Sequence, residues 1–543
     1  MKQMTCADAI VQSLIDHGVD TIFGLPGAQT YAFFDALSRR KNDIKLICSR
    51  HEQGAAYMAY GYAKSTGRVG VYCVVPGPGV LNTTAALCTA HNAPVLCITG
   101  QIPSEFIGVG HGMLHELPDQ LTTLRTLTKW AARIDHAADT PSVMAAAFKN
   151  LTSGRIQPVA VEIPADILGQ SREVPLDFPS YPAPEITPEP SRISKAANLI
   201  REAKRPMIMV GSGAIGAQQE VLELAKLIQA PVVSFRGGRG LVSDESPYGF
   251  NCAAGYKIYD ETDLIIGVGT RLELPAFRWQ EGVATQTLIR IDIDPTQMVR
   301  LRGDVSILSD ARLGMRALLD ELQQNFTPAT SREAEFARIK AESWQDIQKV
   351  QPQMSFLNTI REVLPRDGFL VEEICQVGFT AWFGFPVYEP RKLVTCGYQG
   401  NLGHGFQTAL GVKTANPESA VISITGDGGF MFGVQELATA VQYKIGLITI
   451  IFNNSAFGNV RRDQINLYQS GPYGSDLQNP DFVKLAESFG AAAHRVEDHA
   501  DLKATLQTAL KQSQDGPVVI EVVCERGSEV SPFEFLMPAN YGS

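Results

Sequence analysis

The chain contains 543 residues, of which 45% are hydrophobic and 19% are charged, and its formal net charge is −10. This length is too great for one hydrophobic core, so we expect two or three domains of an ordinary globular enzyme. The negative charge and the lack of a basic cluster argue against a nucleic-acid partner, and no apolar run is long enough to predict a membrane span.

The first 170 residues alternate strand-like and helix-like segments and predict an N-terminal α/β domain. Residues 1–6 lead directly into an amphipathic helix, which is not typical of a signal peptide. The nine cysteines contain no Cys-x-x-Cys pair and are typical of free thiols, so we expect a cytoplasmic protein. Residues 68–75 predict a buried strand that ends in the glycine turn Pro76-Gly-Pro-Gly79.

A proline-rich stretch, residues 174–190, predicts a linker to a second α/β unit over residues 190–325. Within this unit, Gly211-Ser-Gly-Ala-Ile-Gly216 follows a strand and fits the Gly-x-Gly-x-x-Gly pattern of dinucleotide-binding domains. A nicotinamide site also needs an acidic residue after the next strand, to bind the ribose. That strand, residues 231–235, is followed by Arg236, so we expect a Rossmann-like domain that does not bind NAD.

The third unit, residues 355–543, begins after a polar helical connection. In it, residues 420–425 and 446–452 are short apolar runs that predict buried parallel strands. Residues 433–442 between them have helical periodicity, so the sequence predicts a β-α-β unit with a right-handed crossover.

Polar residues follow both strands of this β-α-β unit. Gly426-Asp-Gly-Gly429 ends the first strand, with a helix N-terminus expected after Gly429, and Asn453-Asn454 follow the second strand. Both sites should lie at the carboxyl ends of parallel strands, where α/β sheets bind ligands. Asp427 and Asn454 offer the hard oxygens that Mg2+ takes together with phosphate oxygens, so we predict a site for a metal-bound diphosphate.

These patterns are similar to those of the thiamine diphosphate (ThDP) enzymes of the acetolactate synthase, benzoylformate decarboxylase and benzaldehyde lyase group. Their ThDP motif is Gly-Asp-Gly, a spacer and Asn-Asn, which matches residues 426–454, and their Arg-His-Glu run matches Arg50-His-Glu52. Further matches occur in the same order along the chain: Phe23-Gly-Leu-Pro-Gly27, Pro76-Gly-Pro-Gly79, Thr128-Lys-Trp130 and Gly397-Tyr-Gln-Gly-Asn-Leu-Gly403. The resemblance implies three doubly wound parallel-sheet α/β domains, which are pyrimidine-binding, central Rossmann-like and diphosphate-binding.

The resemblance also implies roles for individual residues. Asp427, Asn454 and the backbone carbonyl of Ala456 would bind Mg2+. Glu52 would be catalytic, as a buried carboxyl hydrogen-bonded to N1′ of the pyrimidine ring. The expected cofactor-binding set is Pro26, Gly27, Glu52, Gln376, Gly400, Leu402, Gly426, Asp427, Gly428, Gly429, Asn454, Ala456, Phe457, Gly458 and Asn459. In this set Leu402 would wedge between the two cofactor rings, and the carbonyl of Gly400 would accept a hydrogen bond from the N4′ amino group.

The sequence says less about the substrate pocket than about the cofactor site. Two further residues are candidates for the catalytic set. Gln29 stands where benzaldehyde lyase has an active-site histidine. His115 lies near a glutamine position of lyases and synthases, and an imidazole titrates near neutrality. The adjacent His-His pair typical of pyruvate decarboxylases is absent, because His111 and His115 are separated. The pattern from Leu114 to Gln120 also resembles decarboxylases of guanidino 2-oxo acids.

The resemblance implies a ThDP- and Mg2+-dependent enzyme that decarboxylates a 2-oxo acid and, through an enamine intermediate, joins the remainder to a carbonyl acceptor. The alternatives are a simple 2-oxo acid decarboxylase, and a lyase of 2-hydroxy ketones or 2-hydroxyacyl-CoA compounds. A non-catalytic relative would have no need of intact Glu52, Asp427 and Asn454. FAD is not expected, because residues 267–277 lack the Asp-Asp-Arg of flavin-binding synthases.

The resemblance further implies a homodimer or homotetramer. In the family the cofactor lies between the pyrimidine domain of one subunit and the diphosphate domain of another. The tail, residues 528–535, would either close over the pocket as a lid or pack on the protein surface.

Overall fold

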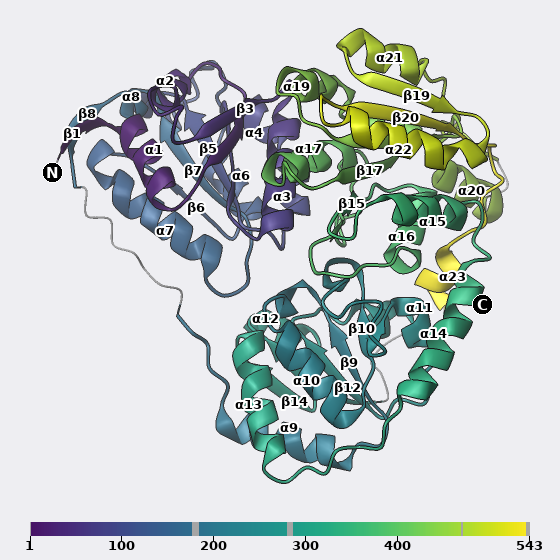
Figure 1. The fold of residues 1–543 in the computed structure, drawn as a ribbon. Coiled ribbons are helices and arrows are strands. Elements are labelled where there is room, and N and C mark those ends of the chain that lie inside the picture. The colour runs from purple at the N-terminus through teal and green to yellow at the C-terminus, as the bar shows by residue number, and fades with distance from the viewer. Residues whose placement is uncertain (1, 176–183, 280–285, 469–470, 539–543) are drawn as a thin grey trace.

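The computed structural model describes residues 2–175, 184–279, 286–468 and 471–538, and Figure 1 shows three α/β domains in the described part of the chain. Each domain is built on a six-stranded sheet whose neighbouring strands are all parallel, which confirms the expected fold class. Part of the expected linker, residues 176–183, lies outside the described residues. No helix among the described residues is long and apolar enough to cross a membrane.

The N-terminal sheet has strands that are short and, in its centre, completely buried, as parallel strands covered on both faces should be. Its order is β3 (Lys45–Cys48), β2 (Thr21–Gly24), β4 (Gly70–Val74), β5 (Val95–Gln101), β7 (Val159–Pro164) and β6 (Trp130–Arg133). The α-helices are α1 (Cys6–Asp16), α2 (Tyr31–Arg39), α3 (Glu52–Thr66), α4 (Pro78–Asn82), α5 (Thr84–Thr89), α6 (Gln120–Leu127), α7 (Thr140–Thr152) and α8 (Ala165–Leu168). An antiparallel pair, β1 (Lys2–Thr5) and β8 (Ser171–Val174), brings the two ends of this domain together.

The central sheet has the strand order of a Rossmann fold, 3-2-1-4-5-6 when its strands are numbered along the domain. The strands are β11 (Gly249–Phe250), β10 (Val232–Ser234), β9 (Pro206–Val210), β12 (Leu264–Val268), β13 (Thr287–Asp292) and β14 (Val305–Leu308). The α-helices are α9 (Pro190–Glu202), α10 (Gln218–Ile228), α11 (Cys252–Tyr256), α12 (Pro295–Arg300) and α13 (Ala311–Gln323). Helix α14 (Glu333–Ile347) then leads to the third domain.

The C-terminal sheet repeats the topology of the N-terminal sheet, because each has the order 2-1-3-4-6-5 when its own strands are numbered along the chain. Its strands are β16 (Leu393–Val394), β15 (Phe369–Val371), β17 (Val421–Gly426), β18 (Ile448–Asn453), β20 (Val518–Val523) and β19 (Ala492–Val496). The α-helices are α15 (Gln353–Val363), α16 (Gln376–Gly384), α17 (Gly405–Ala415), α18 (Asp427–Phe430), α19 (Leu437–Gln442), α20 (Gly458–Leu467), α21 (Phe482–Phe489), α22 (Leu502–Gln512) and α23 (Phe533–Leu536).

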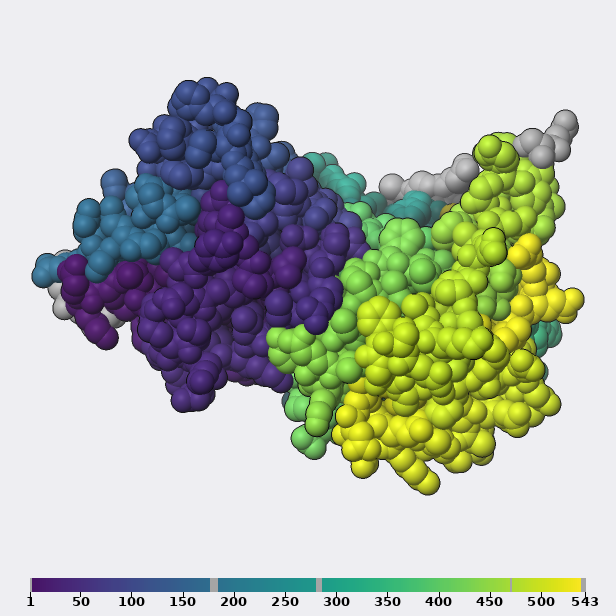
Figure 2. Space-filling view, turned by 90° about the horizontal axis from the view of Figure 1, so that it is seen from above, coloured from purple at the N-terminus to yellow at the C-terminus, as the bar shows by residue number. Residues whose placement is uncertain are grey.

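Helices α3 and α17 join the N-terminal and C-terminal domains, and they lie side by side between the sheets of these two domains (Figure 1). A Cβ atom at Gly61 would collide with the carbonyl oxygen of Thr408, and a Cβ atom at Gly411 with that of Met58. Glycine at both positions therefore lets the two helix backbones touch. One hydrophobic cluster runs across this contact and includes side chains of both helices, and the space-filling view shows the two domains in direct contact (Figure 2).

Candidate functional site

Asp427 lies where β17 ends, and only 2% of its surface is exposed. The helix expected over residues 433–442 begins as a 3-10 turn (Val434–Glu436) and continues as α19 (Leu437–Gln442). A short helix that was not expected, α18, begins at Asp427 itself. Only Gly426 keeps an extended backbone (φ −83°, ψ 161°), and Gly428 and Gly429 already belong to this short helix. The N–H groups of these glycines are therefore among those that the helix itself leaves unpaired.

The Asp427 carboxylate is surrounded by donors but by no cation among the described residues. Its Oδ2 accepts a 2.6 Å hydrogen bond from Nδ2 of Asn479, and backbone N–H groups of Gly428 and Ala456 also donate to it. Burial raises the pKa of Asp427, although these hydrogen bonds act in the opposite direction. A bound divalent cation would compensate this buried charge, so the residues present fit a metal at this position.

The loop after β18 approaches Asp427 from the neighbouring strand. Nδ2 of Asn479 also donates to Oδ1 of Asn453 at 3.0 Å, so one amide bridges the two strand ends. Nδ2 of Asn454 donates to Glu529 at 2.7 Å, which leaves the amide oxygen of Asn454 as the atom that can bind a ligand. Ser455, which lies between Asn454 and Ala456, has a left-handed backbone (φ 55°).

The next turn of this loop packs directly on the glycines of α18. A Cβ atom at Gly428 would collide with the ring of Phe457, and a Cβ atom at Gly458 would lie 2.9 Å from Nδ2 of Asn454. The backbone N–H of Phe457 donates to Ser475 at 2.8 Å. The structure therefore brings the expected residues of the ThDP motif together in one place, at the carboxyl ends of β17 and β18.

Two other segments border the same place. Gln376, at the start of α16, donates from Nε2 to Oδ1 of Asn459 at 3.5 Å, and its own Oε1 is buried without a partner among the described residues. An unpaired buried amide oxygen is the kind of group that a bound ligand or its water satisfies. Leu402 reaches the motif as well, because its Cδ1 lies 3.3 Å from where a Cβ atom of Gly429 would be. Gly400, in the same loop, is exposed and has a φ of 62°.

Glu52 is the first residue of α3, and its side chain is 14% exposed. Its Oε2 accepts a 3.0 Å hydrogen bond from Nδ2 of Asn82. The carboxylate of Glu436, from the C-terminal domain, accepts hydrogen bonds from the backbone N–H groups of Arg50 at 3.1 Å and His51 at 2.9 Å. The C-terminal domain therefore holds the chain just before Glu52 and fixes the start of α3.

Gln29 and His115 are 86 residues apart in sequence but lie in direct contact. Nε2 of Gln29 donates to the carbonyl of Leu114 at 2.9 Å, and Oε1 of Gln29 lies 2.8 Å from Nδ1 of His115. Because that amide oxygen can only accept, Nδ1 of His115 carries the hydrogen, and Nε2 of the neutral ring remains an acceptor. Both residues have a left-handed backbone, with φ of 66° and 69°, and such strained positions are frequent at functional sites.

Two glycines lie directly beneath this pair, Gly77 in the expected turn after β4 and Gly100 near the end of β5. A Cβ atom at Gly77 would contact the backbone of His115, and a Cβ atom at Gly100 would contact that of Gln29. Pro26 and Gly27 precede Gln29 in the turn after β2, where Gly27 packs on Val75. The N-terminal candidates thus follow the carboxyl ends of β2, β3 and β5, around the glycine turn after β4.

The site residues form two separate groups within one chain. Among the described residues, no hydrogen bond or ion pair joins Glu52, Gln29 or His115 to Asp427 or Asn454. Large exposed apolar side chains occur near both groups in sequence: Tyr31, Leu81, Val109 and Leu114 in the N-terminal domain, and Met431, Phe432, Val460, Ile465, Leu467 and Tyr468 in the C-terminal domain. These side chains are exposed in a single copy of the chain.

The described part of the C-terminal tail packs on α16 of its own domain and on α11 of the central domain. The ring of Phe533 lies 5.2 Å from that of Phe379, and the ring of Phe535 lies 5.2 Å from that of Phe383. The packing of Phe533 and Phe535 agrees with the second expectation for residues 528–535, and the lid stays a prediction. The tail nevertheless reaches the site, because Glu529 binds Asn454 and Arg526 donates to the carbonyl of Ser455 at 2.7 Å.

A cavity of about 340 Å³ opens at the carboxyl ends of β9 and β12, between the three domains. Its lining includes Lys64, Arg155, Arg271 and Arg391. The glycine pattern of the central domain has a packing role here, because a Cβ atom at Gly213 would lie 2.9 Å from the backbone of Gly269. The turns after β9 and β12 therefore touch, so close packing explains glycine at these positions without a bound dinucleotide.

Replacing Lys64 by methionine is expected to remove a rise in the free energy of unfolding that the wild type shows between pH 8 and 10. Burial and the nearby Arg391 lower the pKa of Lys64 to about 8. Between this value and the ordinary lysine pKa of about 10.4, the unfolded state binds more protons than the folded state, so the stability of the wild type should rise with pH. We expect thermal denaturation to show this rise from pH 8 to 10, and Lys64→Met to flatten it by about 1–3 kcal/mol. The exposed variant Lys195→Met should keep the rise, and an identical rise in Lys64→Met would contradict the assignment.

Three stretches of the chain match known domain families. Residues 4–123 match "Thiamine pyrophosphate enzyme, N-terminal TPP binding domain". Residues 193–318 match the central domain of the same enzymes, and residues 373–522 match their C-terminal TPP binding domain. The matches follow the order of the three sheets.

Similar proteins cover almost the whole chain. The probable 2-ketoarginine decarboxylase AruI of Pseudomonas aeruginosa is 32% identical, over 97% of this chain and 95% of its own. The probable acetolactate synthase large subunit of Methanocaldococcus jannaschii is 33% identical, over 96% of this chain and 92% of its own. The acetolactate synthase isozyme 3 large subunit of Escherichia coli is 31% identical, over 97% of this chain and 96% of its own.

Proposed function

This chain belongs to the thiamine pyrophosphate enzyme family, and from that premise we propose that it decarboxylates a 2-oxo acid and joins the remaining carbon group to a carbonyl acceptor. That it is a ThDP-dependent enzyme of 2-oxo acids, making or breaking a C–C bond, follows from the three domains and the named relatives. The carboligation is our proposal, and the nearly full-length similarity to acetolactate synthases carries it.

We propose that Mg2+ and the diphosphate are held at the ends of β17 and β18. The metal ligands would be Asp427, the side-chain oxygen of Asn454 and the backbone carbonyl of Ala456. The buried Asp427 carboxylate, which has no cationic partner in the described part of the chain, supports this assignment, and so does the close packing of Gly428 on Phe457. Asn479 would orient Asp427, because its amide donates a 2.6 Å hydrogen bond to the carboxylate. Glu529 would orient Asn454, because its carboxylate accepts a 2.7 Å hydrogen bond from the amide.

In the proposed reaction the protein controls the position of protons. Bound ThDP would supply a nucleophilic carbon for addition to the 2-oxo group and a cationic ring that accepts the electron pair released when CO2 leaves. Glu52 would share a proton with N1′ of the pyrimidine ring, and its hydrogen bond from Asn82 fixes the carboxylate for that contact. Leu402, which reaches Gly429, would set the angle between the two rings.

We propose that two copies of the chain build each site. Glu52 and Asp427 belong to separate groups in one chain, and exposed apolar side chains occur near both. Placing the N-terminal group of one copy on the C-terminal group of the other would bury this apolar surface and complete the cofactor site. The assembly would be a homodimer or a pair of homodimers.

The Gln29–His115 pair is the proposed substrate end of the site. Nε2 of His115 is free to accept a proton, and Gln29 holds the imidazole in that tautomer. A carboligase needs such a group to exchange a proton with the acceptor carbonyl oxygen. Once it carries a proton at Nε2, the same group could instead protonate the carbon from which CO2 has left, and the 2-ketoarginine decarboxylase among the relatives supports simple decarboxylation as the second candidate.

The test is product identification with ThDP, Mg2+ and a panel of 2-oxo acids, including pyruvate and a guanidino 2-oxo acid. Mass spectrometry with and without aldehyde acceptors would follow CO2 release and the organic product. The expected result is CO2 release with a hydroxyketone or acetolactate-type product. Release of CO2 with only free aldehyde would replace carboligation by the second candidate. No release despite bound ThDP would contradict both and leave a lyase of 2-hydroxy ketones or 2-hydroxyacyl-CoA compounds.

All nine cysteines are free, which supports a reducing, cytoplasmic compartment for this proposed function. We do not expect FAD, because residues 267–277 lack the Asp-Asp-Arg of flavin-binding synthases.

A further inference from the structure

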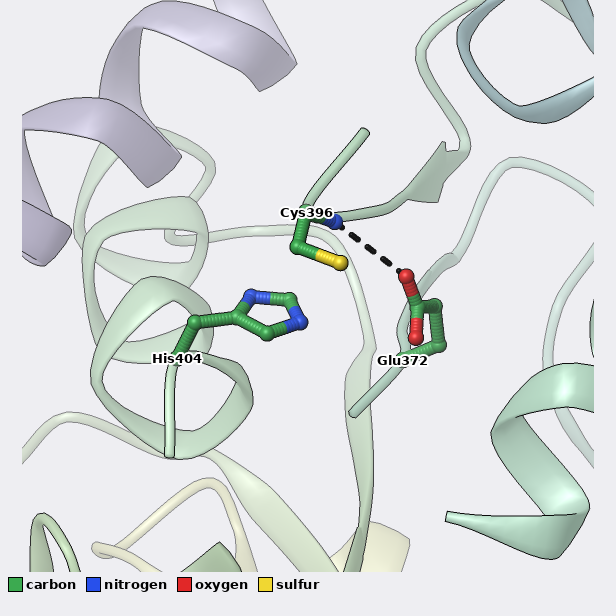
Figure 3. Close-up of side chains that lie close together, drawn as sticks. All are labelled: Glu372, Cys396 and His404. Atoms are coloured by element: carbon green, nitrogen blue, oxygen red, sulfur yellow. Dashed lines mark hydrogen bonds between the residues drawn. The ribbon is translucent and has the colours of Figure 1, made fainter. Parts of the chain in front are cut away.

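Three side chains of different chemistry meet inside the C-terminal domain, next to the loop that carries Leu402. Glu372 follows β15, Cys396 follows β16, and His404 directly precedes α17. Figure 3 shows them pointing toward one another. One ligand atom from each lies within 4.8 Å of the other two. Glu372 and His404 are 0% exposed and Cys396 is 1% exposed, so bulk water does not reach them.

Several polar atoms of this cluster have no partner among the described residues. Both ring nitrogens of His404 lack a hydrogen-bond partner, and so does Oε2 of Glu372, although the side chain of Trp382, whose Nε1 is also unpaired, lies close enough to interact with this carboxylate. The other oxygen of Glu372 accepts a 3.2 Å hydrogen bond from the backbone N–H of Cys396. Buried polar atoms normally have a partner, and unpaired ones call for an explanation such as an ion.

The neighbouring Glu373 does not supply the missing partner. Its two oxygens accept 2.8 Å hydrogen bonds from the backbone N–H groups of Ile374 and Gly405. Its Oε1 lies 3.9 Å from Nε2 of His404, which is beyond hydrogen-bond distance. Glu373 is therefore engaged in holding the backbone, while the His404 ring has no hydrogen-bond partner among the residues that the structure describes.

We propose that Glu372, Cys396 and His404 bind a transition-metal ion of the Zn2+ type, separate from the Mg2+ proposed at Asp427. One thiolate, one imidazole and one carboxylate are a ligand set that Zn2+ accepts, whereas Mg2+ and Ca2+ take oxygen ligands. Two ligand atoms of a tetrahedral Zn2+ are about 3.5 Å apart, so binding requires the three side chains to close by about 1 Å. A water molecule would complete the fourth position.

The proposed metal would tie three segments that the backbone alone does not connect. It would link the ends of β15 and β16 to the start of α17, on either side of the loop 397–403. Leu402 lies in that loop, two residues before His404. The metal would thus have a positioning role for the loop, and none of its ligands would touch the reacting atoms.

Metal analysis of the full-length protein tests this proposal. The protein is produced with Zn2+ or Co2+ in the medium, purified without chelator and assayed for metal by mass spectrometry. We expect about one ion per chain and, with Co2+, an absorption band from a thiolate ligand. The band separates this site from Co2+ bound at Asp427, which would have oxygen ligands only.

Variants locate the metal. Cys396→Ser and His404→Gln should lose the ion and the thiolate band. Cys375→Ser is the matched control, because Cys375 is a nearby thiol whose Sγ accepts from the backbone N–H of Gly378, a contact that serine can retain. Absence of the band in the Co2+-loaded wild type would overturn the proposal even if a variant failed to fold. Full metal retention in folded Cys396→Ser and His404→Gln would overturn it too.

Discussion

Replacing Asp427 by alanine is expected to abolish Mg2+-dependent binding of ThDP. The carboxylate is the only charged group proposed for the metal, and it is 2% exposed, so water cannot replace it easily. Outer partners of metal ligands are typically worth 10- to 100-fold in affinity, so loss of a direct ligand should weaken binding by at least about 100-fold. Isothermal titration calorimetry of ThDP at a fixed Mg2+ concentration measures the effect.

The matched control for this variant is Asp515→Ala, which removes an exposed carboxylate of the same domain. It should bind ThDP like the wild type. Circular dichroism should show that Asp427→Ala keeps its folded structure. An unchanged ThDP affinity in folded Asp427→Ala would remove Asp427 from the metal site.

Replacing Glu52 by glutamine is expected to leave ThDP binding almost unchanged and to lower kcat by about 100- to 10,000-fold. This is the usual range for the loss of a positioned acid or base. Glutamine keeps the size of the side chain and can still accept a hydrogen bond from Asn82, but it cannot exchange a proton with the pyrimidine ring. The measurements are kcat with the preferred 2-oxo acid and ThDP affinity by calorimetry. Glu105→Gln, which changes an exposed carboxylate of the same domain, should retain activity, whereas a normal kcat in Glu52→Gln would exclude Glu52 from the mechanism.

These two variants together test whether a site is shared between copies. In a mixed dimer of Glu52→Gln and Asp427→Ala chains, one of the two shared sites would contain intact Glu52 and intact Asp427. Mixing the inactive proteins under conditions that allow exchange should then restore activity. If each site lay within one chain, every site in the mixture would carry one defect and no activity would return.

The sequence was sufficient for the motif that ends β17 and β18, because short apolar runs, glycine turns and polar residues after them are local patterns. The residues that hold this motif were missed. Asn479 and Glu529 lie in segments without such patterns, and only the fold brings them to Asp427 and Asn454. Helix α18, which begins at Asp427, was not expected either, because two adjacent glycines gave no reason to place them inside a helix.

The N-terminal candidates show the same limit. Gln29 and His115 were each expected from their positions in the sequence, but their hydrogen bond was not. Glu436, which accepts from the backbone before Glu52, comes from the opposite domain, and no local pattern points to it. Contacts of this kind depend on how the domains pack, and a single sequence does not reveal that packing.

The crossing of α3 and α17 has the form of an isologous interface enclosed in one polypeptide. Gly61 meets the carbonyl of Thr408, and Gly411 meets that of Met58, so each glycine touches the residue three positions before the other glycine. In an isologous contact, residue i of one subunit meets residue j of the other and the reverse also holds. Because both helices follow the second strand of sheets with the same strand order, the chain has the architecture that duplication and fusion of a gene for a symmetric dimer produces. Once joined, the two halves could diverge independently, so that one retained a glutamate at a helix start and the other an aspartate at a strand end.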